Sequence, residues 1–133
     1  MVRLEIPGSA EYVSIVRHAV GGLARRMSFS QTQIDDLMLA VGEACTNAVK
    51  HGCNDNGCRR VEINCLVVAD GLMVEIRNAI DDCESPAVPE RPDLSKEGGL
   101  GLWLIHQVVD EVDFAWDADT AVIRMLKRVG TGM

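Results

Sequence analysis

A carboxylate, an amide and an imidazole follow one another at intervals of four residues in the segment EACTNAVKHG, residues 43–52. Because a helix repeats about every 3.6 residues, Glu43, Asn47 and Lys50 share one side of a predicted helix, and His51 lies at the margin of that side. Oxygen ligands beside a cation and an imidazole suit a magnesium-bound polyphosphate, so this side of the helix is a candidate site for one.

The helix that carries these residues is predicted to begin at Ser30, because Ser30 and Gln33 form a capping box. Asp36 joins the polar side, and Ala40 and Ala44 lie between its polar groups, small enough to let a ligand approach the backbone. The opposite side has the spacing of a core-facing stripe, formed by Ile34, Leu37, Met38, Val41, Cys45, Ala48 and Val49.

A glycine cluster at residues 98–101 is the second feature with chemical potential. Glycines before a helix let the backbone come close to phosphate oxygens, and the free N–H groups of the helix start favour negative charge. The alternative is a flexible loop that ends in glycine N-caps. The apolar helix is expected at residues 102–109, with Trp103 as a core residue or an interface anchor.

A first helix and two hairpins complete the predicted elements. The helix is expected from an N-cap at Ser9 to about Met27, with Ile15 on its apolar side and a bend or close packing contact at Gly21 and Gly22. Alternation of apolar and polar residues predicts strands at residues 2–6, 60–68, 72–80, 112–116 and 121–127, and the last four form two hairpins.

Two segments leave alternatives open. Residues 81–97 are acidic, contain three prolines and show no period, which is typical of a lid, a binding loop or a disordered segment; we expect a mobile lid. Cys53 and Cys58 flank a turn near His51, but their separation exceeds the usual zinc-ligand spacing and a fourth ligand is not evident.

Composition limits the classes of function. A chain of 133 residues with 47% hydrophobic residues is expected to form one domain, residues 1–133, and its net charge of -7 argues against nucleic-acid and anionic-membrane partners. The sequence has no apolar run of about 20 residues and no hydrophobic signal core at its start, so we expect a cytoplasmic protein. Five cysteines are an odd number for a disulfide framework, and Cys45 and Cys65 have core positions.

The order of these features resembles the GHKL ATPase superfamily, and within it the short anti-sigma-factor serine kinases of the RsbW and SpoIIAB type. The likeness covers nearly the whole chain and is carried by IDDLMLAVGEACTNAVKHG, by GGLGLWLIHQVVDEVDF and by the final strand AVIRMLK. It implies a two-layer α/β sandwich, in which about three helices cover one face of a mixed, mostly antiparallel sheet. It also implies ATP and magnesium as cofactors, with Glu43 as the general base and Asn47 as the magnesium ligand.

The resemblance implies a wider nucleotide site, made of Asn47, His51, Asn78, Asp82, Gly98, Gly99, Leu100, Gly101, Leu102 and Thr120. One departure lies at Asn78, where the family carries the aspartate of an Asp-x-Gly-x-Gly motif that reads the adenine amine. Asparagine can accept the same hydrogen bond without the charge, and Asp81 or Asp82 is an alternative acceptor. We therefore expect weakened adenine recognition.

The implied function is that of an anti-sigma factor with ATP-dependent serine kinase activity. Its implied partners are a sigma factor, a STAS-type anti-anti-sigma protein that offers the serine, and a second copy of the chain. The alternative is a protein-binding module that has kept the fold, lost catalysis and does not need ATP.

Overall fold

The computed structural model describes residues 1–51, 60–79, 99–117 and 120–129. Every predicted strand is present, and its ends lie within one residue of the prediction. Along the chain the elements are β1 (Val2–Pro7), the 3-10 helix η1 (Ala10–Tyr12), α1 (Val13–Arg25), α2 (Gln31–His51), β2 (Arg60–Val68), β3 (Gly71–Ala79), α3 (Gly99–Val108), β4 (Glu111–Asp117) and β5 (Thr120–Arg128).

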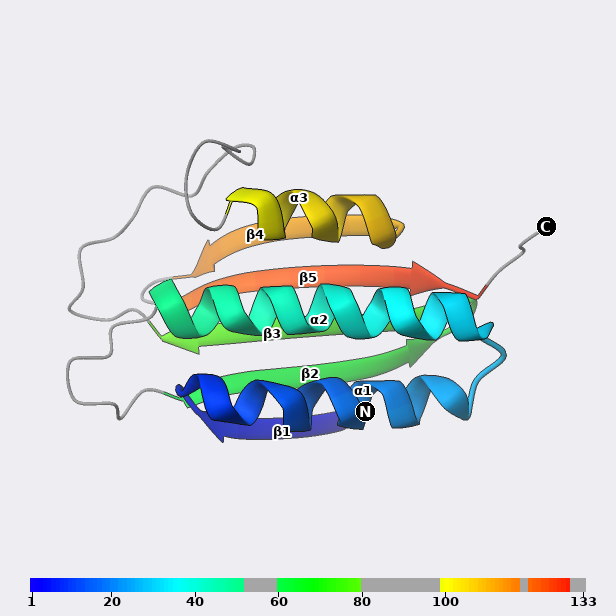
Figure 1. Ribbon diagram of the computed structural model, residues 1–133, viewed down its shortest axis with the longest axis horizontal. Helices are drawn as coiled ribbons and strands as arrows, with labels where there is room; N and C mark the ends of the chain where they lie inside the picture. The colour runs from blue at the N-terminus through cyan, green and yellow to red at the C-terminus, as the bar shows by residue number, and fades with distance from the viewer. Residues whose placement is uncertain (52–59, 80–98, 118–119, 130–133) are drawn as a thin grey trace.

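The strands form one five-stranded sheet in the order β1-β2-β3-β5-β4, and its four pairings are antiparallel. The three α-helices lie side by side over one face of this sheet (Figure 1). The predicted two-layer α/β sandwich is confirmed. The two hairpins bring β3 and β5 together at the centre of the sheet, beneath α2.

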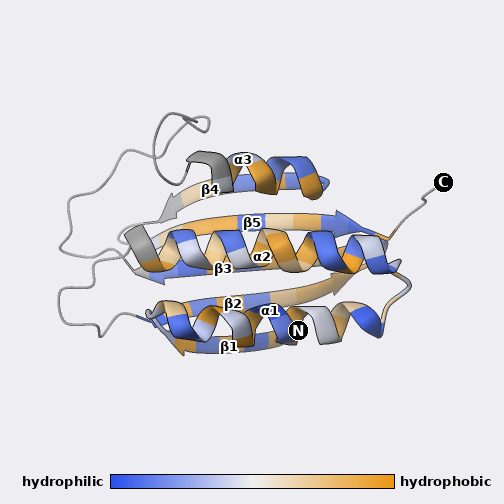
Figure 2. Cartoon of the chain, viewed as in Figure 1, coloured by the Kyte–Doolittle hydropathy of each residue, from blue (hydrophilic) through white to orange (hydrophobic). Residues whose placement is uncertain are grey.

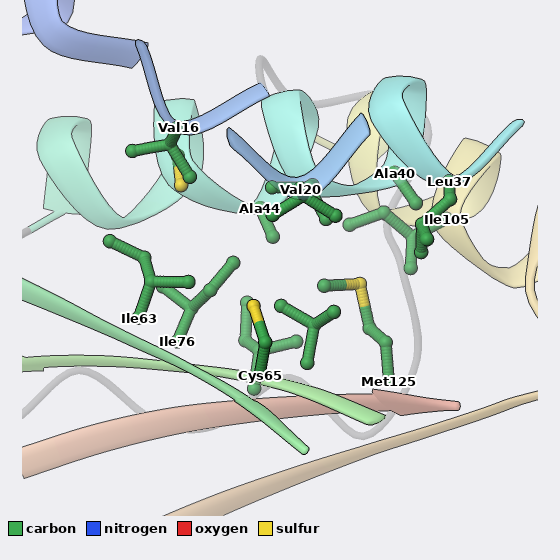
Figure 3. Packing of buried hydrophobic residues seen from close by; sticks show 14 of the residues in the cluster. Val16, Val20, Leu37, Ala40, Ala44, Ile63, Cys65, Ile76, Ile105 and Met125 are labelled. Carbon is green, nitrogen blue, oxygen red and sulfur yellow. The ribbon is translucent and has the colours of Figure 1, made fainter. Parts of the chain in front are cut away.

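The core lies between the two layers, where labelled side chains from the helices and the sheet point toward one another (Figure 3). Hydrophobic and hydrophilic residues alternate along the strands and recur along the helices (Figure 2), as strand period and helix period require. Fully buried members of the core include Val20 of α1, Leu37 of α2, Ile63 of β2, Ile76 of β3 and Met125 of β5. Both predicted core thiols, Cys45 and Cys65, are buried and free.

Helix α1 differs from its prediction at two residues. Ser9 makes no side-chain cap hydrogen bond, because a 3-10 turn intervenes and Tyr12 takes the N-cap position of α1. Ile15 is 52% exposed, so its assignment to the apolar side is wrong. Gly21 confirms the close packing contact, since a Cβ there would lie 2.6 Å from Sδ of Met38 on α2.

Helix α2 begins with the predicted capping box. The Ser30 N–H donates to Oε1 of Gln33 at 2.9 Å, and the Gln33 N–H donates to Oγ of Ser30 at 3.1 Å. These reciprocal bonds satisfy two backbone donors that a helix start leaves without partners. None of the helices in the described ranges is long and apolar enough to cross a membrane.

Helix α3 begins earlier than predicted. It starts at Gly99, so part of the glycine cluster forms the first helical turn and does not precede the helix. Leu102 and Ile105 are buried against the sheet, whereas Trp103 is 40% exposed. The core assignment of Trp103 is therefore wrong, because Trp103 lies on the side of α3 opposite its buried stripe.

The sheet face opposite the helices carries a connected polar cluster, which we call the outer network. Glu75 of β3 accepts hydrogen bonds from Arg77 at 2.9 Å, from Arg124 at 2.8 Å and from Asn64 at 3.2 Å. The cluster reaches all five strands and comprises Arg3, Glu62, Asn64, Glu75, Arg77, Asp113 and Arg124. Partial burial would raise the pKa of Glu75, but the three hydrogen-bond donors outweigh burial and lower that pKa from 4.5 to about 2.

Candidate active site

Helices α2 and α3 lie side by side and run in opposite directions (Figure 1). Two of the contacts along them involve polar groups: Glu43 lies against Gly101 in the first turn of α3, and Lys127 of β5 links Asp36 to Val108 at the last turn. We call this contact zone, defined by Asp36, Glu43, Gly101 and Val108, the α2–α3 seam. The polar side of α2 that the sequence predicts therefore faces α3.

Glu43 is half-buried at this seam. A Cβ built on Gly101 would lie 2.5 Å from Oε1 of Glu43, so the carboxylate occupies the space that a side chain at Gly101 would fill. No side chain that the structure describes forms a hydrogen bond or an ion pair with Glu43. A half-buried carboxylate left without such a partner is suited to accept a proton from a ligand.

Asn47 lies one turn after Glu43 on the same side of α2 and is half-buried. The two alanines that the sequence places between these polar groups are not accessible to a ligand, because Ala40 and Ala44 are both 0% exposed. They pack into the core, so the expectation that they admit a ligand to the backbone is wrong. Because α2 lies between α1 and α3 as well as over the sheet, its buried sector is wider than the sequence pattern indicates (Figure 1).

The first turn of α3 has unpaired backbone N–H groups and a buried side chain, that of Leu102. A helix leaves the N–H groups of its first turn without intrahelical partners, and its dipole favours negative charge there. Gly99, Leu100 and Gly101 supply these groups, whereas the side chain of Leu102 is 9% exposed and belongs to the core. At Leu102 only the backbone is therefore available to a phosphate, and Gly101 keeps that turn free of a Cβ beside Glu43.

Asn78 lies at the end of β3 that meets the end of α2. It is 8% exposed, and its Nδ2 donates to the carbonyl oxygen of Ala48 at 3.4 Å. Ala48 is in the last turn of α2, so this bond satisfies one of the carbonyl groups that a helix end leaves without a partner. Thr120 is half-buried on β5 and pairs with Ala79, next to Asn78 along β3.

These donors fit a magnesium nucleotide in kind. Asn47 has an amide oxygen and Glu43 a carboxylate. The first turn of α3 offers backbone N–H groups, and Gly101 leaves open the space that a Cβ would fill. Asn78 retains a carbonyl oxygen after its Nδ2 is used. The structure therefore brings the metal-ligand, phosphate and adenine candidates to the same end of the α2–α3 seam and the sheet.

Several predictions lie outside the described residues. Among them are Asp82, Gly98 and the lid at residues 81–97, together with the zinc candidates Cys53 and Cys58. His51 is the last residue of α2, but its side chain is not described, and the same holds for Lys50 and Leu100.

Lys127 is a residue that the sequence reasoning missed. It is 9% exposed and follows Ile123 and Met125 at alternate positions of β5, which are core positions. A lysine at an inward position of a strand was the available signal, because lysine is rarely buried without a partner. Asp36, predicted to belong to the polar side of α2, is that partner, at 3.6 Å from the lysine Nζ.

The sequence of this chain is similar to those of known ATPase domains and protein kinases. The family model described as histidine kinase-like ATPase domain matches residues 6–127. A serine-protein kinase RsbW from Bacillus velezensis is 38% identical over 120 residues, which cover 84% of this chain and 75% of the relative. The serine-protein kinase RsbW of Bacillus subtilis is 36% identical over 120 residues, with the same shares of the two chains.

Solved structures show the same fold. The RsbU and RsbW domains of a Mycobacterium tuberculosis protein align with a TM-score of 0.67 and 15% identity, over 97% of this chain and 32% of that one. A histidine kinase domain from Erythrobacter litoralis aligns with a TM-score of 0.59 and 19% identity, over 93% of this chain and 62% of that one. This chain therefore spans about a third of the first of these solved chains.

Proposed function

This chain belongs to the histidine kinase-like ATPase domain family, among the serine-protein kinases of the RsbW type, and we propose that it phosphorylates a serine of a STAS-type anti-anti-sigma protein. We also propose that it sequesters a sigma factor while that antagonist is phosphorylated. The proposal assigns an ATP site to the end of the α2–α3 seam, with Glu43 as its general base.

The observation that carries the proposal is the position of the Glu43 carboxylate. It is half-buried, it touches the first turn of α3 at Gly101, and no described side chain neutralises it. A nucleotide whose phosphates meet the N–H groups of that turn would present its terminal phosphate within reach of Glu43. A carboxylate is then available where the attacking hydroxyl must lose its proton.

The proposed reaction is an in-line transfer. The serine Oγ of the partner attacks the γ-phosphorus of ATP as Glu43 accepts the hydroxyl proton, and the bond from the γ-phosphorus to the bridging oxygen breaks, so that ADP leaves. Asn47 is assigned to hold magnesium through its amide oxygen, and the ion supplies neutralising charge to the phosphate oxygens. Positioning and electrostatics are the main contributions that a protein makes to this chemistry.

The remaining site residues are assigned along the nucleotide. Gly98, Gly99, Leu100, Gly101 and Leu102 would approach the phosphates through their backbone, while Asn78 would accept a hydrogen bond from the adenine amine and Thr120 would border the adenine end. His51 and Asp82 would complete the rim. Asn78 offers a neutral acceptor, which is weaker than a carboxylate, so modest ATP affinity is part of the proposal.

Partners follow from charge and from the family. With a net charge of -7, the chain is suited to a neutral or basic protein surface and not to nucleic acid. We propose a sigma factor and a STAS-type antagonist as the two ligands, a homodimer as the active form, and the cytoplasm as the compartment that supplies ATP.

Calorimetry and phosphotransfer together test this function. Titration of the full chain with millimolar ATP should release heat with magnesium and markedly less after EDTA is added. Radiolabel from the γ-phosphate should then appear on a serine of a purified STAS-type protein. Absence of heat at millimolar ATP with magnesium would refute the kinase, and a chain that still bound a sigma factor would be a docking module.

A further inference from the structure

Among the residues that the structure describes, Lys127 is the one charged side chain that is buried, at 9% exposed. Burial of an ammonium group is unfavourable unless its charge and its hydrogen-bonding capacity are both compensated. Lys127 lies on β5 at a position where an apolar residue would pack without that requirement. Its presence therefore calls for an account of what it contacts.

The ammonium group of Lys127 joins three elements. Its Nζ donates to the carbonyl oxygen of Val108 at 2.5 Å and lies 3.6 Å from Oδ2 of Asp36 on α2. Val108 is the last residue of α3, so its carbonyl is one that the helix leaves without a partner, at the negative end of the helix dipole. The lysine thus links β5, the early part of α2 and the end of α3.

The two polar contacts of the α2–α3 seam are equally spaced along both helices. Asp36 and Glu43 are seven residues apart on α2, and Gly101 and Val108 are seven residues apart on α3. Seven residues make about 10 Å of helix on either side. Since the helices are antiparallel, the Lys127 contact at one end of the seam and the contact of Gly101 with Glu43 at the other depend on the same axial position of α3.

Apolar packing and the backbone bond from Asp110 to Leu126 on β5 also hold this end of α3 on the sheet. Leu102, Ile105 and Val109 bury one stripe of α3, but hydrophobic contact is non-directional and tolerates small shifts along a helix axis. A hydrogen bond at 2.5 Å to a main-chain carbonyl does not tolerate such shifts, because it weakens steeply with distance and angle. The Lys127 contact therefore adds a directional restraint on the last residue of α3 itself, beside the bonds that hold Asp110 to β5.

We propose that Lys127 is a positioning residue for phosphotransfer: by joining Asp36 to the end of α3, it fixes the first turn of α3 against the Glu43 carboxylate. This inference rests on the proposed kinase function. A shift of about 1 Å between reacting groups is enough to slow catalysis by about 100-fold, so loss of the restraint should act mainly on turnover.

Lys127→Met tests the inference, because methionine keeps an unbranched side chain that is one atom shorter and removes the charge and the donor. Arg128→Met is the matched control: it removes one positive charge from the next residue of β5, whose side chain pairs with Glu111 and Asp70 at the surface. We expect Lys127→Met to lower the turnover rate about 100-fold, with ATP affinity changed less than about threefold, and Arg128→Met to leave both near wild type.

Asp36→Asn provides a second variant in case Lys127→Met folds poorly. It should lower turnover in the same direction, and the double variant should be no slower than Lys127→Met alone, because the two residues act through one contact. Wild-type turnover per folded molecule in Lys127→Met, measured beside a lowered melting temperature, would show a purely structural lysine and overturn the inference.

Amide exchange separates failure of this inference from failure of the kinase function, because it needs no nucleotide. Lys127→Met should raise exchange at Ile105 in the second half of α3 and at Val109, whose N–H donates to the Ile105 carbonyl just after the helix, and Arg128→Met should not. Unchanged exchange in α3 would overturn the positioning role even in a chain that did not bind ATP.

Discussion

Two half-buried glutamates, Glu75 on the sheet face away from the helices and Glu43 on helix α2, have opposite surroundings. Glu75, in the outer network, accepts hydrogen bonds from Arg77, Arg124 and Asn64, and its pKa is lowered to about 2. Glu43, at the α2–α3 seam, touches Gly101 and has no hydrogen bond or ion pair with any described side chain. One carboxylate is fully engaged by the fold, and the other remains available to a ligand.

The difference in hydrogen bonding suits Glu75 to stabilise the sheet and Glu43 to act as a base. A carboxylate whose oxygens are occupied by two guanidinium groups and an amide stabilises the sheet but cannot take a proton near neutral pH. A carboxylate without such donors contributes little to stability and retains its capacity as a base. Substitutions at these two glutamates should therefore have different consequences.

The largest expected effect comes from Glu43→Gln. Glutamine keeps the shape beside Gly101 but cannot accept the serine proton, so phosphotransfer should fall by about 100-fold to 10,000-fold. ATP binding measured by calorimetry, and docking of the protein partners, should change little. Glu75→Gln is the matched control and should keep its phosphotransfer rate per folded molecule. Full radiolabel transfer by Glu43→Gln would exclude Glu43 as the base.

Gly101→Ala should come next, with a loss of activity that is not a loss of stability. The new Cβ would lie 2.5 Å from Oε1 of Glu43, and the flexible end of Glu43 can move away at little cost. Displacement of the base should lower turnover by about 10-fold to 100-fold. The melting temperature should stay the same or rise, because alanine is the better helix former.

Gly22→Ala is the control for that substitution. Nothing described lies within 4 Å of a Cβ at Gly22, so the variant should gain about 0.5 to 1 kcal/mol of stability and keep its turnover. Equal turnover of Gly101→Ala and Gly22→Ala would show that the contact with Glu43 has no role in the reaction.

The third effect is a pH dependence of stability. The pKa of Glu75 is about 2 in the folded protein, below its ordinary 4.5, so the folded state binds fewer protons between these values. The contribution of Glu75 is complete above about pH 4.5 and is lost as the pH falls toward 2. We expect Glu75→Gln to lower the free energy of unfolding by about 2 kcal/mol at pH 7, allowing for the partial exposure of its arginine partners.

Urea unfolding of wild type and Glu75→Gln from pH 7 to pH 2 measures this directly. The two stabilities should converge as the pH falls, because Glu75 becomes protonated in the wild type, while the other carboxylates titrate in both proteins and cancel from the difference. A difference that stayed constant across this range would mean that the outer network does not depend on the ionised form of Glu75.

Asn78→Asp should have the smallest effect, with two opposing parts. A charged acceptor should strengthen adenine binding by about tenfold, but aspartate cannot donate to Ala48 and places a negative charge at the negative end of the α2 dipole. We expect tighter ATP binding by calorimetry together with a loss of about 1 kcal/mol of stability. Unchanged affinity would remove Asn78 from the adenine site.

The local sequence pattern was sufficient to predict the positions of the strands. Strand ends lie within one residue of their predicted positions because alternation, turns and caps are properties of a few neighbouring residues. The capping box of Ser30 and Gln33 is confirmed for the same reason. The prediction starts α3 too late because it assigns the glycines to the segment before the helix, whereas packing of Leu102 and Ile105 offsets the low helix propensity of glycine.

The sequence by itself determined that Glu43 and Asn47 share one side of a helix, since helix geometry fixes that relation whatever surrounds it. Only the tertiary structure decided what that side faces: Ala40 is buried, Glu43 meets Gly101, and Asp36 meets Lys127. These pairs lie far apart in the chain, and their contact depends on how α2 and α3 pack on the sheet. Periodicity gives the direction of a side chain from its own helix axis, but the neighbour that it meets is set by the packing of other elements.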